Sequence, residues 1–131
     1  MDATPSTGQP AVLIVEDEPG WCAVYAELLA DYACHYAVSY GEARGLLQRH
    51  TFALAIVDLH LASPAAREEN RDGFWLLKAA RQRGVPALVV SALGAREDID
   101  RAYDEFGVFA FIEKELFDRR GFARTVAEAL Q

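Results

Sequence analysis

The sequence predicts an α/β protein in which five parallel strands alternate with five helices that cover both faces of the sheet. Two observations support this doubly wound fold. Short unbroken apolar runs, typical of strands buried on both faces, alternate with segments whose apolar residues recur every three or four positions. The 131 residues are 52% hydrophobic and 25% charged, which provides apolar material for one packed core. We therefore expect one domain over residues 11–131, preceded by a flexible polar tail over residues 1–10.

The strands are expected where the apolar runs occur, each ending at a polar residue or a turn. A weaker candidate, His35–Ser39, supplies the second strand in chain order. The four stronger runs are Val12–Val15, Leu54–Val57, Ala87–Val90 and Phe109–Ile112.

The segments between the runs carry the buried stripes of amphipathic helices. The third helix is expected from Gly73 to Arg83, because Gly84 favours a helix end and Pro86 prevents continuation. The fifth is expected from Asp118, a residue suited to the N-cap, to Leu130. The other three stripes are Trp21, Tyr25, Leu28, Leu29 and Tyr32; Ala43, Leu46 and Leu47; and Ile99, Ala102, Tyr103 and Phe106.

The overall charge excludes several classes of partner. Twenty acidic against 13 basic residues give a net charge of -7, which repels nucleic-acid phosphates and anionic membranes. Cys22 and Cys34 lack the spacing of a zinc or redox motif. The first ten residues lack the charged and apolar regions of a signal peptide, and no apolar run is long enough to span a membrane. We expect a soluble cytoplasmic protein that binds neither nucleic acid nor membranes directly.

Acidic side chains are expected to gather at one edge of the sheet, outside the carboxyl ends of the strands. With the strand order 2-1-3-4-5, the first and third strands are neighbours, so Glu16, Asp17 and Asp58 converge. Carboxylates about 4 Å apart repel by roughly 4 kcal/mol at an effective dielectric constant of about 20, so this cluster needs a counter-charge. Oxygen ligands favour Mg²⁺ or Mn²⁺. The alternative is a set of solvated acids without a metal.

Two further polar side chains at the same edge suit phosphoryl transfer. Ser91 follows the fourth run and Lys114 the fifth. The lysine and a cation would neutralise phosphoryl oxygens, the serine hydroxyl would donate a hydrogen bond, and Asp58 would be the attacking carboxylate.

These motifs together resemble one family. The stretch from Ala11 to Gln131 is similar to the receiver domain of bacterial two-component response regulators, which has a flavodoxin-like fold. One departure is Glu115, which follows Lys114 where the family usually has a proline. The segments that carry the resemblance are residues 12–19 (VLIVEDEP), 56–59 (IVDL), 72–73 (DG), 85–92 (VPALVVSA) and 111–114 (FIEK).

The resemblance implies a signalling switch and not an enzyme. Asp58 would accept a phosphoryl group from the phosphohistidine of a histidine kinase or phosphotransfer protein, and Ser91 and Lys114 would bind the resulting aspartyl phosphate. Phe111 occupies the position of the switch aromatic, and a purely structural role in core packing is the alternative. Phosphorylation would change the face formed by the fourth helix, fifth strand and fifth helix, and thereby binding to a downstream protein. The implied Mg²⁺ ligands are Glu16, Asp17, the Asp58 side chain and the backbone carbonyl of His60.

Several alternatives remain at this stage. A pseudo-receiver would keep the fold as a phosphorylation-independent interaction module. A flavin carrier is disfavoured because Glu16, Asp17 and Glu18 would repel the flavin phosphate, and a phosphohydrolase would need a second acid where His60 stands. The long segment His60–Asp72 is either a tolerated surface loop or an element that affects partner choice or gating. The charged faces of the last two helices are either a solvated surface or the contact of a homodimer.

Overall fold

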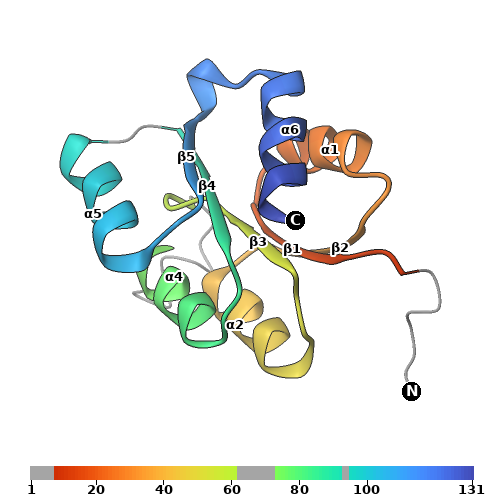
Figure 1. Cartoon of the computed structure of the whole chain (residues 1–131), viewed down its shortest axis with the longest axis horizontal. Coiled ribbons are helices and arrows are strands. Elements are labelled where there is room, and N and C mark those ends of the chain that lie inside the picture. Colours follow the sequence, from red (N-terminus) through yellow and green to blue (C-terminus); the bar gives the residue numbers. More distant parts are fainter. Residues whose placement is uncertain (1–7, 62–72, 93–94) are drawn as a thin grey trace.

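The five strands form one parallel sheet, as predicted. The computed structural model describes residues 8–61, 73–92 and 95–131. Its strands lie in the order β2-β1-β3-β4-β5, so the chain reverses its direction of winding after β2 (Figure 1). All four neighbouring pairs are parallel. The strands are β1 (Ala11–Val15), β2 (Ala33–Ala37), β3 (Leu54–Val57), β4 (Ala87–Ser91) and β5 (Ala110–Glu113).

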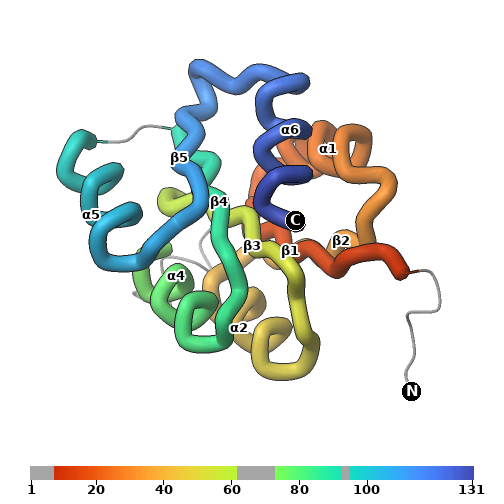
Figure 2. The backbone as a smooth tube through the Cα atoms, viewed as in Figure 1, coloured from red at the N-terminus to blue at the C-terminus, as the bar shows by residue number. Residues whose placement is uncertain are grey.

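Helices cover both faces of this sheet. Two of them, α1 and α6, lie on one face, and α2, α4 and α5 lie on the other (Figures 1 and 2). A short 3₁₀ helix, η2 (Lys114–Leu116), joins β5 to α6. The α-helices are α1 (Pro19–Leu28), α2 (Tyr40–Arg49), α4 (Gly73–Gln82), α5 (Arg96–Phe106) and α6 (Arg119–Ala129).

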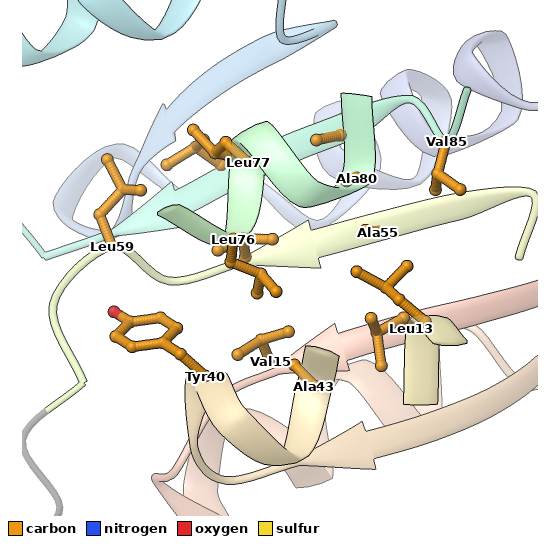
Figure 3. Packing of buried hydrophobic residues seen from close by; sticks show 14 of the residues in the cluster. Leu13, Val15, Tyr40, Ala43, Ala55, Leu59, Leu76, Leu77, Ala80 and Val85 are labelled. Carbon is orange, nitrogen blue, oxygen red and sulfur yellow. The ribbon is translucent and has the colours of Figure 1, made fainter. Parts of the chain in front are cut away.

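Successive side chains of a strand point to opposite faces of the sheet, so a separate hydrophobic cluster forms under each layer of helices. Leu13 and Val15 face the larger cluster, which also contains Leu76 and Leu77 of α4 and Ala43 of α2 (Figure 3). On the other face, the second cluster joins the inner residues of β1, β3 and β4 to α1 and α6. Because the central strands are covered on both sides, their carboxyl ends are held in fixed register.

Several element boundaries differ from the sequence prediction. The second strand is Ala33–Ala37 rather than His35–Ser39, because the Ser39 hydroxyl accepts a hydrogen bond from the Glu42 backbone and caps α2. Helix α1 ends at Leu28, so Tyr32 lies beyond it.

At the other end of the chain, Phe109 precedes β5 and is 46% exposed. The predicted N-cap Asp118 is confirmed, since its carboxylate accepts from Gly121 N. Gly84 follows α4 with a φ of 72°, a conformation that glycine adopts without strain.

Most of the predicted tail and of the long loop lies outside the described residues, which omit 1–7 and 62–72. The tail and the loop therefore stay predictions, as does Asp72. Over the part of the chain that the structure covers, no helix has the length and apolar character needed to cross a membrane.

Candidate functional site

The carboxyl ends of four strands bring together four side chains that the sequence analysis selected. Glu16 follows β1, Asp58 follows β3, Ser91 ends β4, and Lys114 follows β5. Their strands are adjacent and in register, with Val15 opposite Val57 and Ser91 opposite Glu113. We call Glu16, Asp58, Ser91 and Lys114 the carboxylate site.

Asp58 is the centre of this site. Its side chain is 4% exposed, and both carboxylate oxygens accept hydrogen bonds. Oδ1 accepts from the Ser91 hydroxyl at 3.2 Å and from the backbone N–H of His60 at 2.9 Å. Oδ2 accepts from the Lys114 ammonium at 2.9 Å. The site thus holds one nearly buried carboxylate between a hydroxyl and a cation.

Lys114 joins the acids that follow β1 and β3. Its ammonium lies 2.8 Å from Glu16 Oε1 and 2.9 Å from Asp58 Oδ2, with Glu18 at 3.5 Å. Burial lowers the pKa of this lysine, but its close contacts with the Glu16 and Asp58 carboxylates outweigh that effect, and the net pKa is raised. Lys114 is therefore a permanent cation at neutral pH.

Glu16 is less completely satisfied. It is 1% exposed, and its Oε2 accepts from the backbone N–H of Glu18 at 3.1 Å. Its Oε1 touches the Lys114 ammonium, but the contact lacks the angles of a hydrogen bond, so this buried oxygen has an ionic partner and no hydrogen-bond donor. Burial raises the pKa of Glu16, and the adjacent Lys114 ammonium opposes the increase only in part.

The residues after β1 fit a divalent cation. Carboxylate oxygens of Glu16, Asp17 and Glu18 lie within 4.8 Å of one another, the one such group of three among the residues described. The buried Oε1 of Glu16 accepts no hydrogen bond, and coordination to a hard cation would satisfy this oxygen. Asp58, the third acid expected to converge here, lies on the other side of the Lys114 ammonium, which contacts both Glu16 and Asp58. The roles of Asp58 and of the His60 carbonyl as ligands stay predictions.

Phe111 and Glu115 lie at the border of the site. Phe111 is half-buried and packs against the larger core cluster, and its backbone N–H donates to the Tyr103 hydroxyl at 2.9 Å. No cis peptide bond occurs among the described residues. The Lys114 ammonium contacts Asp58 although Glu115 follows the lysine. The proline usual in the family is thus not needed to place the ammonium.

Two contributors to the site were missed by sequence reasoning. Tyr40 of α2 donates its hydroxyl to the Asp58 carbonyl at 2.8 Å and accepts from Leu61 N, which fastens the segment after β3. Figure 3 shows the Tyr40 hydroxyl directed toward this segment. Trp21 of α1 lies with its ring 4.9 Å from the Lys114 ammonium. The apolar spacing around Trp21 predicts only a buried helix stripe, because such spacing carries no signal of a cation.

Comparisons with known proteins agree on one family. The model of the response regulator receiver domain matches residues 12–125. A CheY-like response regulator receiver domain protein from Methanospirillum hungatei JF-1 has a TM-score of 0.80 at 23% identity, with 94% of each chain covered. The non-phosphorylated HemR receiver domain from Leptospira biflexa has a TM-score of 0.79 at 25% identity, covering 94% of this chain and 95% of that one. A search of curated proteins finds no match.

Proposed function

Because the chain belongs to the family of response regulator receiver domains, we propose that Asp58 accepts a phosphoryl group from a phosphohistidine of a histidine kinase or phosphotransfer protein. One observation carries the proposal. The Asp58 carboxylate is held between the Ser91 hydroxyl and the Lys114 ammonium, the two donors that would next bind phosphoryl oxygens. The domain would act as a signalling switch, without a separate substrate of its own.

The proposed transfer uses the atoms of this site directly. A carboxylate oxygen of Asp58 attacks phosphorus, the P–N bond of the phosphohistidine breaks, and its electron pair returns to the imidazole nitrogen, which takes a proton from solvent. As the new P–O bond forms, Lys114 and Ser91 pass from the carboxylate to the phosphoryl oxygens. Both donors already lie within 3.2 Å of Asp58, so the exchange needs only small movements.

Glu16 and Asp17 are the residues that we propose to hold Mg²⁺, with Glu18 beside them and with Asp58 and the His60 carbonyl completing the set. The buried Oε1 of Glu16 supports this assignment. When bound, the cation would neutralise charge on the transferring phosphoryl group. Mn²⁺ has similar oxygen preferences and would substitute.

The proposed output is a change on the face formed by α5, β5 and α6. Phe111 links this face to the core, and Tyr103 joins α5 to β5 through the Phe111 backbone. Tyr103, Phe109 and Leu116 are exposed at 43%, 46% and 74%, so this side of the molecule offers apolar contacts to a downstream protein or to a second copy. Because the donors bind the phosphorylated form more strongly, phosphate would shift an existing equilibrium of this face.

The test is phosphorylation by a small donor. The protein is incubated with Mg²⁺ and acetyl phosphate and weighed by intact mass spectrometry, beside a receiver of known activity and the Asp58→Asn variant. We expect a labile phosphoryl adduct on the wild type and none on Asp58→Asn. A wild type without an adduct, where the reference receiver gains one, would identify a pseudo-receiver. Equal labelling of Asp58→Asn would reject Asp58 as the acceptor.

A further inference from the structure

The Lys114 ammonium has an aromatic neighbour in addition to its acids. Trp21, in the first turns of α1, places its ring 4.9 Å from the ammonium. Glu16 and Asp58 contact the same nitrogen at 2.8 and 2.9 Å. An aromatic face at this distance attracts a cation, and more strongly where water is largely excluded. The Lys114 side chain is only 7% exposed, so this contact is largely shielded from solvent.

Trp21 is itself fixed by a chain of aromatic contacts that leads to α6. Its ring meets Phe117 edge-on at 4.9 Å, and Phe117 lies 5.0 Å from Phe122. Tyr25, one turn along α1, lies 5.6 Å from Phe122 and is 1% exposed. Phe117 directly follows η2, the short helix that begins with Lys114. The contacts therefore bind the chain segment on the carboxyl side of Lys114 to α1.

We propose that Trp21 is a positioning residue for Lys114, holding the ammonium against Asp58 during phosphoryl transfer. This inference rests on the proposed function. Glu115 follows Lys114, and the segment from Lys114 to Phe117 is fixed by the contact of Phe117 with Trp21. Without the indole, the lysine side chain would sample positions toward Glu18, which lies 3.5 Å away and is 64% exposed. Fewer molecules would then have the ammonium in place when a phosphoryl group arrives.

The contact can be tested independently of phosphorylation, because the chain has only two lysines, Lys78 and Lys114. Lysine labelled with ¹³C at the ε-carbon gives two NMR signals, and Lys78→Arg assigns them. We expect the ε-protons of Lys114 to be shifted upfield of those of Lys78 by the indole ring current. Trp21→Leu should remove this shift, Trp21→Phe should keep part of it, and Trp75→Phe, at the other tryptophan, should leave it unchanged. An unchanged Lys114 signal in Trp21→Leu would overturn the contact.

The functional arm measures the rate of phosphorylation by acetyl phosphate at saturating Mg²⁺. We expect Trp21→Leu to be slower by roughly 2- to 10-fold, Trp21→Phe to be intermediate, and the donor concentration for half-maximal rate to be unchanged. If Trp21→Leu does not fold, Trp21→Phe decides alone. A full rate in the folded variants overturns this inference and leaves the proposed function intact. A wild type that takes no phosphoryl group overturns both.

Discussion

The middle of the sheet and the carboxyl ends of its strands bury different kinds of residue. Strands β1 and β3 are entirely apolar and β4 is apolar as far as Val90, with Val12, Leu54 and Leu88 all at 0% exposure. All four polar or charged residues that are buried in the described chain lie at or beyond the carboxyl ends of strands. They are Glu16, Ser39, Asp58 and Ser91.

This difference separates stability from function. Burial of apolar side chains in the middle of the sheet favours folding by about 25 cal/mol per Å². A buried charge is tolerated only where partners replace its lost hydration. At the carboxylate site Lys114 is that partner for Glu16 and Asp58. Substitutions in the middle of the sheet should therefore change the free energy of unfolding most, while those at the site should change chemistry and pH dependence.

The largest effect is expected for Leu76→Ala. Leu76 of α4 is 0% exposed and belongs to the same core cluster as Leu13 and Ala55 of the central strands, so truncation leaves a cavity against the middle of the sheet. We expect the free energy of unfolding to fall by about 3–5 kcal/mol, measured by urea denaturation. Leu116→Ala is the matched control, because Leu116 is 74% exposed and should change stability by less than about 0.5 kcal/mol. Equal losses from the two variants would contradict the contrast.

The second effect tests the site itself. Lys114→Met removes the cation that faces Glu16 and Asp58, so two buried carboxylates lose their counter-charge. We expect a loss of roughly 2–3 kcal/mol in urea denaturation, together with a loss of phosphorylation. The control Lys78→Met, on the exposed face of α4, should reduce neither stability nor phosphorylation. Adding Glu16→Gln to Lys114→Met should restore part of the stability, and a strictly additive double variant would show that the ion pair carries no energy.

The fold was predictable because its signal is local. The apolar runs and helix stripes specify the alternation of strands and helices, and the structure confirms the sheet order. The second strand was misplaced by two residues because Ser39 has the extended backbone of an N-cap, which a sequence pattern does not separate from a strand. Strand identity follows from burial, whereas strand ends depend on individual hydrogen bonds.

The candidate site was predictable only in part. The order of the strands brings Glu16, Asp58, Ser91 and Lys114 together, and each follows or ends an apolar run. The contribution of Trp21 was not predictable, since an aromatic residue in a helix stripe is read as core. Tyr40 was missed for a related reason, because its hydroxyl reaches Asp58 across 18 positions of the sequence. Side-chain direction, which decides both cases, is not contained in periodicity.

The third effect concerns the cation. If Glu16 and Asp17 hold Mg²⁺ in the native state only, Mg²⁺ at ten times its dissociation constant should raise the free energy of unfolding by about 1.4 kcal/mol. Thermal denaturation with and without Mg²⁺ measures this increase. Asp17→Asn should reduce it, whereas Asp104→Asn, on the exposed side of α5, should retain it. An increase of the same size in Asp17→Asn would exclude this residue as a ligand.

The smallest effect concerns how the ionisation of Glu16 changes the free energy of unfolding with pH. Burial raises the pKa of Glu16 above 4.5 in the folded protein, so the native state holds its proton to higher pH than the unfolded chain does. The contribution of this group to stability is then fully present below pH 4.5 and is lost as the pH rises through the folded pKa. With a chelator present, this contribution should be lost from the wild type between pH 4.5 and the raised pKa of Glu16 in the folded protein. The Glu16→Gln variant cannot titrate at this position and should not show that loss.

The same variant should therefore be more stable than the wild type at neutral pH, although it lacks a charge that faces Lys114. Urea denaturation at a series of pH values measures the difference, with Glu97→Gln, on the exposed surface of α5, as the control. A Glu16→Gln variant that is less stable at neutral pH would show that the ion pair outweighs burial. Greater stability combined with slower phosphorylation would show that the charge of Glu16 is kept for function at the expense of stability.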